Sequence, residues 1–348
     1  MARVGIVGTG WGARVQVPAF RAAGLEVAGL AGEHPGKTRR VASELGVPPF
    51  ADWRALIASP IDLVSLVVPP AEHVEMACAA LAAGRHVLAE KPTALDADGA
   101  ARMAETAAAH PDRLALIDHE LRFLPSWRAA RERIRDLGDI RHVEVRYSSP
   151  SRGDPTRPWN WWSDAAQGGG VWGAVGSHYV DAVRYFIGEI DEVQAELKTF
   201  VQRRPAGNGL SEVTSDDFAA VHARITGGAV AAMTFSSVAA ADDPTTLTIT
   251  GAKGAFRLVG SELWEARRAG PWERRTVGEG PPVPGDSPGA FFGSATEYFA
   301  AALRRALDAG DRSALSLAAT FEDGLAHQRV LDAARRSHEN EGRWERVR

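Results

Sequence analysis

The sequence predicts a two-domain protein, in which a doubly wound α/β domain precedes an α+β domain built on a large, mostly antiparallel sheet. Three observations support this fold class. The chain has 348 residues, which is more than one ordinary core accommodates. Unbroken apolar segments alternate with amphipathic ones over residues 1–120, whereas after Asp139 apolar and polar residues alternate one by one. We therefore expect domains at 1–122 and 123–348.

The first domain is expected to hold a parallel sheet with helices on both faces, because its apolar runs are continuous. The expected strands are 3–7, 26–31, 62–68, 85–89 and 114–118. The expected helices are one that ends at residue 22 and those at 36–45, 71–83 and 96–109. Repeated βα units of this kind are typical of nucleotide-binding sheets.

The second domain is expected to be mainly antiparallel, because its strands alternate polar and apolar residues. The expected strands are 140–148, 192–201, 218–225, 229–236, 246–250 and 255–258, with a hairpin turn at Gly227-Gly228. A helix is expected at 172–186, and two more at 291–309 and 316–336 close the chain. The Pro/Gly-rich segment 278–289 reads as a loop.

Composition excludes several classes of protein. Hydrophobic residues make up 45% and charged residues 24%, with a net charge of −4, so nothing favours nucleic acid or an anionic membrane as partner. The single cysteine, Cys78, cannot form an intrachain disulfide. No apolar run reaches the ~18 residues of a membrane span, and the N-terminus does not resemble a signal peptide. We expect a cytoplasmic protein.

A glycine-rich turn follows the first expected strand. The sequence reads Gly8-Thr9-Gly10-Trp11-Gly12-Ala13, a G-x-G-x-x-A pattern between a strand and a helix. Gly8 permits the tight turn, and Gly10 lets a pyrophosphate approach the backbone at the positive end of the helix. The pattern predicts a dinucleotide site that includes Trp11 and Gly12.

The end of the second expected strand bears on the choice of dinucleotide. Glu33 favours NAD, because an acid there binds the ribose 2′-hydroxyl, whereas Lys37 favours the 2′-phosphate of NADP. Basic residues on a surface helix are also commonly just solvated. The cofactor is therefore predicted as NAD(P).

The turn Glu90-Lys91-Pro92 follows the strand 85–89. Ligands of a doubly wound sheet bind beyond the carboxyl ends of its strands, so Lys91 is expected at the crevice. A partly desolvated lysine there can exchange a proton with an alcohol or a carbonyl. Pro92 fixes the turn, and a cis peptide bond is one expectation.

The segment GGGVWGAVGSHYVD, residues 168–181, carries a second candidate, His178. A lone histidine on an Ala/Val-rich helix is more often a packing residue than a proton carrier. The three glycines at its start would let the helix approach a ligand closely. By itself the segment leaves both interpretations open.

With these motifs in order, the chain resembles the Gfo/Idh/MocA family of glucose–fructose and inositol oxidoreductases. The resemblance extends over essentially the whole chain and rests on five matching segments: GTGWGA at 8–13, PPAEH at 69–73, AGRHVLAEKP at 83–92, LRFLP at 121–125 and GGGxxxxxGSHxxD at 168–181. The EKP turn together with the GGG…GSH segment is the most specific part of the match.

The resemblance implies roles for individual residues. Gly8 and Gly10 would hold the pyrophosphate. Pro69, Pro70 and His73 would line the dinucleotide side, while Glu90 and Lys91 would lie by the nicotinamide ribose. Lys91 would also face the substrate, and His178 would face the reacting hydroxyl. Members of this family mostly act on a ring hydroxyl or ketone of a sugar or cyclitol, and many are dimers or tetramers.

The chain departs from the family at one position. Family dehydrogenases often carry an Asp four residues before the histidine, on the same helix face, and here that residue is Ala174. The loss removes an acceptor for a substrate hydroxyl and a charge that favours protonated His178. Asp181 and Asp164 are the two candidates for a replacement acid.

Further residues are candidates for the substrate site. Trp162, in the run WNWW, offers an aromatic face that suits sugar C–H groups. His119 and Arg122 follow the strand 114–118 and end near the crevice, and Tyr179 is a weaker candidate, as are Arg152 and Arg157. No metal-binding spacing is found.

The sequence thus predicts an NAD(P)-dependent oxidoreductase acting on CH–OH groups of a sugar, amino sugar or cyclitol, with Lys91 and His178 moving the hydroxyl proton. Two alternatives remain: a non-enzymatic dinucleotide-binding sensor, and a redox-neutral enzyme that recycles NAD while cleaving or epimerising a glycoside. A homodimer or homotetramer is expected.

Overall fold

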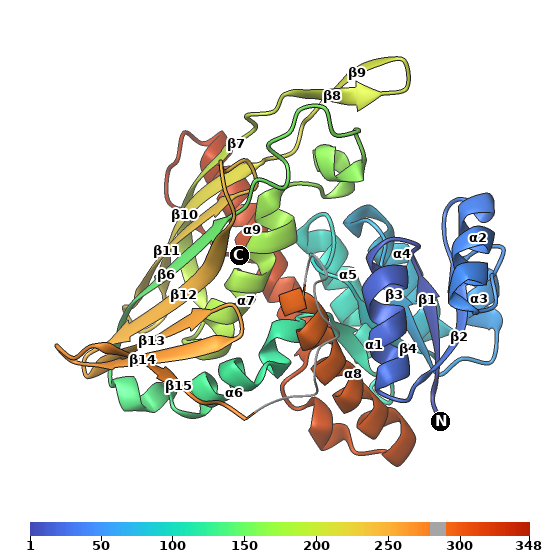
Figure 1. Ribbon diagram of the computed structural model, residues 1–348, viewed down its shortest axis with the longest axis horizontal. Helices are drawn as coiled ribbons and strands as arrows, with labels where there is room; N and C mark the ends of the chain where they lie inside the picture. Colours follow the sequence, from blue (N-terminus) through green and yellow to red (C-terminus); the bar gives the residue numbers. More distant parts are fainter. Residues whose placement is uncertain (279–289) are drawn as a thin grey trace. The chain divides into compact units, whose positions relative to one another are not determined.

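The computed structural model describes residues 1–278 and 290–348, and the chain divides into two compact units. The first contains residues 1–94 and 98–124 with the described part of 280–325. The second contains residues 95–97 and 326–348 with the described part of 125–279. Figure 1 colours the chain from its N-terminus to its C-terminus. Within the described residues, no helix has the length and apolar character needed to cross a bilayer.

The first unit is built on a six-stranded sheet in the order β16-β5-β4-β3-β1-β2. Strands β1 to β4 are labelled in Figure 1. Five strands are parallel: β1 (Arg3–Val7), β2 (Glu26–Ala31), β3 (Leu63–Leu66), β4 (His86–Ala89) and β5 (Ala115–Ile117). The short strand β16 (Ala319–Thr320) is antiparallel to β5. The sequence predicted the five parallel strands, but β16 lies where a helix was expected.

Helices cover both faces of this sheet. They are η1 (Gly12–Gln16), α1 (Val17–Ala22), α2 (Pro35–Leu45), α3 (Trp53–Ala58), α4 (Pro70–Ala82), α5 (Ala97–Ala108), η2 (Glu120–Phe123), α8 (Ala290–Ala309) and η7 (Arg312–Leu315). Successive strand residues enter opposite cores: Val64 packs with Met76 and Met103, whereas Leu63 packs with Phe20 and Phe299. Burial on both faces explains why the strands read as continuous apolar runs.

The helices α3 and α9 differ from the sequence prediction. The helix α3 was not expected, because its six residues are too few to show a periodic pattern; Asp52 caps it by accepting from the Ala55 N–H at 2.8 Å. The closing helix α9 covers Phe321–Glu339 and not 316–336, since residues 319–320 form β16. Its residues up to Leu325 belong to the first unit and the rest to the second. The predicted loop 278–289 lies outside the described residues, apart from Gly278.

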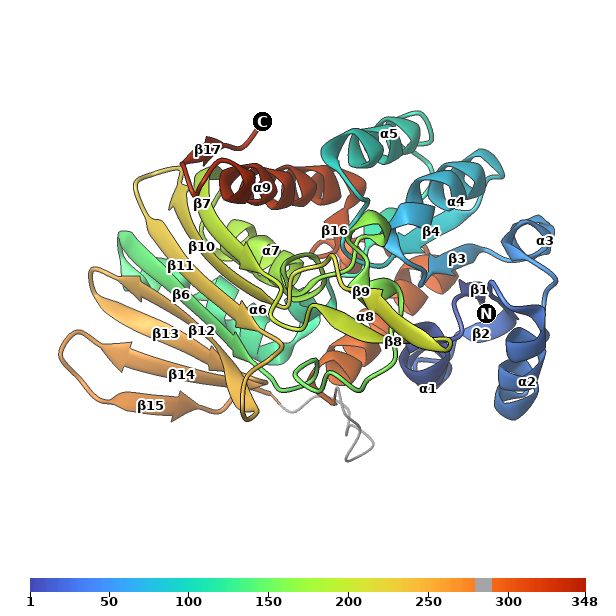
Figure 2. The ribbon, with the colours of Figure 1, turned by 90° about the horizontal axis from the view of Figure 1, so that it is seen from above.

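The second unit is built on a nine-stranded sheet in the order β15-β14-β13-β12-β6-β11-β10-β7-β17, seen side by side in Figure 2. The strands are β6 (Ile140–Ser148), β7 (Ile190–Lys198), β10 (Phe218–Ile225), β11 (Val230–Ser236), β12 (Asp243–Gly251), β13 (Gly254–Val259), β14 (Glu262–Arg267), β15 (Trp272–Arg275) and β17 (Glu345–Arg346). Only the β6–β11 pair is parallel among these described strands. The predicted hairpin turn at Gly227-Gly228 joins β10 to β11 and is confirmed.

The remaining elements of the second unit are short. They are a separate hairpin of β8 (Arg203–Ala206) and β9 (Gly209–Glu212), and the helices α6 (Pro125–Glu132), η3 (Ile134–Leu137), η4 (Trp161–Ser163), η5 (Ala165–Gln167), η6 (Trp172–Gly176) and α7 (Ser177–Phe186). The hairpin, the strands β14, β15 and β17, and the helices α6, η3, η4 and η5 were not predicted. The helix expected at 172–186 is confirmed as η6 and α7 in succession, with a wide first turn.

The glycines of the 168–176 segment have packing reasons within the second unit. A Cβ on Gly169 would lie 2.5 Å from the Trp162 carbonyl oxygen, and one on Gly176 would lie 2.3 Å from the Trp172 ring. Trp172 is fully buried, and its Nε1–H donates to the Leu331 carbonyl at 3.2 Å. These glycines are therefore explained by contacts inside the unit.

We predict that Gly176→Ala destabilises the protein by about 1–3 kcal/mol, because the added methyl overpacks the ring of Trp172. Gly209→Ala is the matched control, since a Cβ there meets no atom within 4 Å. Urea denaturation measures both variants. Equal unfolding free energies for the two variants would contradict this packing role.

Candidate functional site

The glycine-rich turn has the geometry expected of a dinucleotide cradle. Gly8 has φ +136°, and a Cβ there would lie 2.1 Å from the Val67 carbonyl oxygen, so no other residue fits. A Cβ on Gly10 would meet nothing within 4 Å, which leaves open space beside the start of η1. Gly12 instead packs, since its Cβ would lie 2.9 Å from Ile6. The turn is thus free at the position where a pyrophosphate approaches.

The residues after β2 are exposed. Glu33 lies 3.8 Å from the His34 ring, with its side chain 80% exposed, and Lys37 is exposed on the first turn of α2. The pKa of Glu72 is raised, first by its own partial burial and then by the negative charge of Glu33. Both residues are available to a ligand, so the choice between NAD and NADP stays open.

The turn between β3 and α4 is held by a buried histidine. Pro69 precedes α4 and Pro70 begins it, while His73 is completely buried. The His73 ring contacts the Thr93 carbonyl at 3.1 Å and the Val68 carbonyl at 3.0 Å. Burial lowers its pKa to about 4, so the ring is neutral and donates through one nitrogen only. His73 joins two turns at the sheet edge, and its role in the cofactor site stays a prediction.

The predicted Glu-Lys-Pro turn follows β4, at the carboxyl end of the sheet. The Lys91–Pro92 peptide bond is cis, as the sequence suggested. The side chains of Glu90 and Lys91 are 12% and 17% exposed, and Lys91 Nζ lies 4.0 Å from Glu90 Oε2. Lys91 therefore sits at the edge of solvent with a carboxylate beside it.

Behind this turn lies a buried polar network that connects three strands. Gln16 Nε2 donates to Asp118 Oδ2 at 2.9 Å and to Glu90 Oε1 at 3.3 Å. Gln16 Oε1 accepts from Ser65 Oγ at 2.6 Å. Asp118 Oδ1 is buried and receives no hydrogen bond from the described residues. Four side chains from η1, β3, β4 and the end of β5 thus converge behind Lys91.

The carboxyl groups of this network hold protons more tightly than free ones. Burial raises the pKa of Asp118 well above its usual range, and the charge of Glu90 raises it further. The pKa of Glu120 is raised well above its range by burial and by Asp118 and Glu90. Burial also raises the pKa of Glu90, although Lys91 opposes the shift. A proton shared between Glu90 and Asp118 lets the two buried carboxyls bond to each other.

His119 and Arg122, which were predicted near the crevice, are both buried in the first unit. Arg122 Nη1 donates to the Leu317 carbonyl at 3.2 Å and lies 3.7 Å from Asp323 Oδ2. These contacts tie η2 to the segment that contains β16. A role for either residue in binding substrate stays a prediction.

In the second unit, His178 lies on α7 and is 2% exposed. Ala174, four residues earlier, is also buried, so no carboxylate occupies that helix position. The predicted replacement acids have other contacts: Asp181 Oδ1 lies 3.0 Å from His327 Nε2, and Asp164 Oδ1 caps η5 by accepting from the Ala166 N–H at 3.0 Å. Either acid as a partner of His178 therefore stays a prediction.

The two aromatic candidates occupy different environments. Tyr179 is buried and packs on Phe235 with ring centroids 5.7 Å apart, as a core residue does. Trp162 is only half-buried, and its N–H donates at 3.0 Å to the Asn160 side chain that caps η4. Its ring is tilted against that of Trp161, with centroids 5.4 Å apart. Of the two candidates, only Trp162 has part of its side chain exposed.

Asp216 anchors the start of the His178 helix and was not singled out from the sequence. Its Oδ2 accepts from the Trp172 N–H at 2.7 Å, and a Cβ on Gly170, which has φ +113°, would lie 2.3 Å from its Oδ1. Burial raises its pKa to about 6. Asp216 fixes the direction in which η6 and α7 leave the glycine run.

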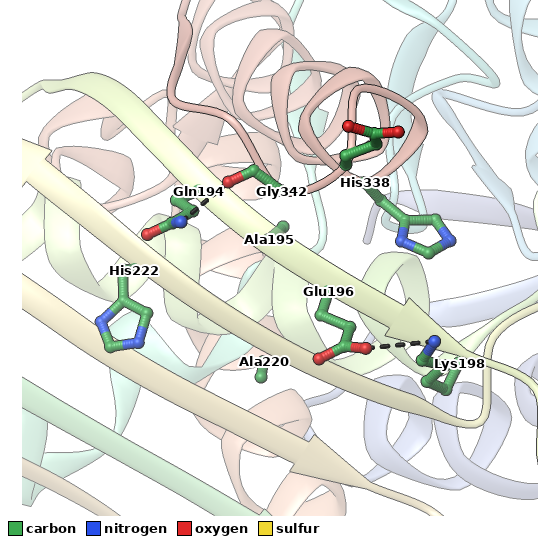
Figure 3. A pocket seen from close by; sticks show the side chains of 9 residues that line it. Gln194, Ala195, Glu196, Lys198, Ala220, His222, His338 and Gly342 are labelled. Atoms are coloured by element: carbon green, nitrogen blue, oxygen red, sulfur yellow. Dashed lines mark hydrogen bonds and ion pairs between the residues drawn. The ribbon is translucent and has the colours of Figure 1, made fainter.

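A hollow on the surface of the second unit lies away from these residues. It has a volume of about 530 Å³ and is lined by Gln194, Glu196, Lys198, His222, His338 and neighbouring residues of β7, β10 and the α9 end (Figure 3). Glu196 pairs with Lys198 at 3.1 Å, and Gln194 donates to the Gly342 carbonyl at 2.8 Å. It is a broad depression on the sheet, and no predicted site residue lines it.

Comparison with known proteins agrees with this geometry. Residues 2–117 match the model of an oxidoreductase family with an NAD-binding Rossmann fold, and residues 127–257 match that of the GFO/IDH/MocA C-terminal domain. The chain is 31% identical to glucose-fructose oxidoreductase domain-containing protein 2 of Xenopus laevis over 99% of this chain and 93% of that protein.

The chain belongs to the Gfo/Idh/MocA oxidoreductase family. Its first unit is an NAD-binding Rossmann domain, as its glycine turn predicted.

Solved structures of the family share the fold. An oxidoreductase domain protein from Kribbella flavida is 26% identical, with a TM-score of 0.88 over 100% of this chain and 99% of that one. Levoglucosan dehydrogenase in complex with NADH and levoglucosan is 24% identical, with a TM-score of 0.87 and the same coverage. An inositol dehydrogenase homolog from Azotobacter vinelandii, in complex with NADH and myo-inositol, is 23% identical, with a TM-score of 0.81 over 99% and 97%.

We predict that Asp118→Asn makes stability less dependent on pH. A carboxyl whose pKa is raised by folding contributes its full stability below its unfolded value, about pH 4, and loses it as the pH rises through the folded value. The amide has no such loss and can still donate to Glu90. The melting temperature of the variant should therefore rise relative to the wild type as the pH increases above about 4.

Thermal melts at several pH values measure this effect. Asp242→Asn is the control, because Asp242 is exposed. A difference between Asp118→Asn and wild type that is constant across this pH range would show that the Asp118 proton does not contribute.

Proposed function

We propose that the protein is an NAD(P)-dependent oxidoreductase that transfers a hydride between nicotinamide and a hydroxyl or keto carbon of a sugar, amino sugar or cyclitol. The observation that carries the proposal is Lys91, which lies at the carboxyl end of β4 beside Glu90 and the Gln16–Asp118 pair. Relatives with the same fold were solved with NADH and levoglucosan or myo-inositol, which supports this substrate class.

The first unit offers the groups that would hold the cofactor. The N–H groups at the Gly8–Gly12 turn, with Trp11 next to them, would bind the pyrophosphate. Glu33 and Lys37 are exposed after β2, where they would contact the adenosine ribose. Pro69 and Pro70 shape the neighbouring turn, and Glu90 would contact the nicotinamide ribose. Nicotinamide, when bound, supplies or accepts the hydride.

Two side chains would handle the proton. When an alcohol is oxidised, its carbon loses a hydride and its oxygen loses a proton, so a base must accept that proton; reduction requires the reverse. We assign this exchange to Lys91 and His178. Lys91 would accept the proton as a neutral amine, and Glu90 would hold the resulting ammonium in place, while the proton shared with Asp118 would limit the negative charge buried behind it.

One observation favours a second function. Ala174 leaves the His178 helix without the carboxylate that family dehydrogenases often carry. A dinucleotide-binding protein without redox activity would tolerate that loss. Tight cofactor binding together with redox silence toward a broad polyol panel would favour such a sensor. Redox silence with glycoside cleavage or epimerisation would favour an enzyme that recycles its cofactor within a turnover.

Self-association is part of the proposal, because homodimers and homotetramers are common in the family. Light scattering should give a mass of two or four times the 37.2 kDa chain. A monomer at working concentration would contradict this part alone.

We predict that Lys91→Ala lowers turnover at least ~10²-fold, since positioned acid–base groups contribute at this scale. Initial rates of NAD(P)H formation with sugars, sugar acids and inositols measure it. Lys198→Ala, which removes an exposed lysine, is the control. Turnover that survives in Lys91→Ala would exclude Lys91 as the proton carrier.

We predict that His178→Ala also lowers turnover and changes its pH profile, because the variant lacks one of the two groups assigned to move the hydroxyl proton. His222→Ala removes an exposed histidine of the same unit and should leave both unchanged. If His178→Ala retains the turnover and pH profile of the wild type, the histidine is structural and Lys91 alone moves the proton.

A further inference from the structure

Three arginines gather around the loop that connects β6 to η4. Arg152 and Arg157 lie in the loop, and Arg204 comes from β8. Arg157 and Arg204 are near enough to Arg152 for their charges to shift its pKa. All three belong to the second unit, so their positions are fixed relative to one another.

Two of the three arginines hold the loop backbone. Arg204 is 2% exposed and donates from Nη2 to the Arg152 carbonyl at 2.5 Å and from Nη1 to the Asp154 carbonyl at 2.7 Å. Arg157 donates from Nη1 to the Ser151 carbonyl. The Arg152 N–H donates to the Ser237 carbonyl at 2.7 Å. The loop is therefore fastened on both sides of Arg152.

The Arg152 side chain has a different environment. Its guanidinium carbon lies 4.6 Å from the centroid of the Trp162 ring, and the residue is half-buried. Among the described residues, no acceptor is hydrogen-bonded to its guanidinium. Five N–H donors in a planar fork are thus held on an aromatic platform without a protein partner.

The two carboxylates whose charges act on Arg204 accept hydrogen bonds from other groups. Both oxygens of Asp217 accept from backbone N–H groups, those of Phe200 at 2.8 Å and Val201 at 2.9 Å. Asp154 Oδ1 accepts from the Thr156 N–H at 2.8 Å and from its hydroxyl at 2.6 Å. Neither carboxylate is bonded to Arg152 in the structure.

The charge of Arg152 is costly in this setting. Burial, followed by the charges of Arg157 and Arg204, lowers its pKa to about 10, so the group is still protonated at neutral pH. A half-buried cation beside two others, with no anion bonded to it, is the local charge pattern that an anionic ligand relieves.

We propose that Arg152, stacked on Trp162, binds the anionic group of the substrate, so that the preferred ligand is a sugar acid or sugar phosphate and not a neutral polyol. The guanidinium fork matches a carboxylate or phosphate with two parallel hydrogen bonds, and the indole face suits the C–H surface of a sugar ring. The inference rests on the proposed function for the polyol part of the ligand. The anion part rests on the arginine geometry alone.

The same unit links this site to the His178 helix. The Trp162 carbonyl oxygen would lie 2.5 Å from a Cβ on Gly169, and it accepts from Ser215 Oγ at 2.7 Å. Asp216, the next residue, holds the first turn of that helix. The Trp162 platform and the start of the His178 helix are therefore braced by the same few residues.

Calorimetry with the full-length protein tests the proposal without requiring turnover. D-Glucuronate, D-glucose 6-phosphate and D-glucose are titrated separately, in the presence and absence of NADH. At least one of the two anionic sugars should bind about tenfold or more tightly than glucose, the scale of a charge-assisted hydrogen-bonded pair. Which of the two binds more tightly distinguishes a carboxylate from a phosphate as the natural group.

Variants assign the preference to Arg152. Arg152→Met should reduce the anion preference to about threefold or less. Arg152→Lys, which keeps the charge without the fork, should retain an intermediate preference, and it serves if the methionine variant does not fold. Arg141→Met removes an exposed arginine of the same unit and should preserve the full preference.

Three results would overturn the inference: equal affinity of the wild type for all three sugars, no detectable binding of either anionic sugar, or an anion preference that survives in Arg152→Met. If only the proposed oxidoreductase function is wrong, the result differs: anion binding still depends on Arg152, but no polyol reduces NAD or NADP.

Discussion

The site depends on one buried constraint, which is that the Gln16 amide holds two carboxyl groups together behind Lys91. Its Nε2 bonds both Glu90 and Asp118, and its oxygen is fixed by Ser65. Two buried carboxylates at this separation repel each other unless a proton lies between them. The raised pKa values of Glu90 and Asp118 follow from this arrangement, and so does the local charge that Lys91 experiences. The parallel sheet makes the arrangement possible, because neighbouring strands end at the same edge.

In the second unit, the proposed ligand site at Arg152 and Trp162 is also held in place by fixed contacts. Asp216 sets the start of the helix that carries His178, and glycines allow the Trp162 backbone to pack close to that start. Arg157 and Arg204 donate hydrogen bonds to backbone carbonyl groups of the loop. The guanidinium of Arg152 instead lies over the Trp162 ring. The loop thus presents a preorganised cation.

Local patterns in the sequence were sufficient to predict much of the first unit. Gly8 needs a positive φ and a close approach to Val67, which only glycine allows, so its pattern was specific. Lys91 follows an apolar strand directly, and strand ends are readable from composition. Asp118 ends the expected strand 114–118, which follows the strand before Lys91 in the chain. A carboxylate at that strand end is a sequence signal for a residue close to Lys91. Gln16 offered no such signal, because an uncharged amide inside a helix is usually solvated.

What the sequence did not predict depends on tertiary contacts. The strand β16 is two residues long and exists because it pairs with β5. The hairpin β8–β9 alternates too briefly to be recognised, yet it supplies Arg204. The contact of Asp181 with His327 joins residues far apart in the chain, so no local pattern in the sequence indicated it.

The most direct test of the account follows the hydride itself. Sugars, sugar acids and inositols carrying deuterium on their carbinol carbons are incubated with the protein and NAD or NADP, and the cofactor is analysed by mass spectrometry. The account predicts deuterium in the nicotinamide with at least one of these polyols, and its loss when Lys91 is replaced by alanine although the cofactor still binds. Cofactor that binds the wild-type protein but remains unlabelled with every polyol would contradict it.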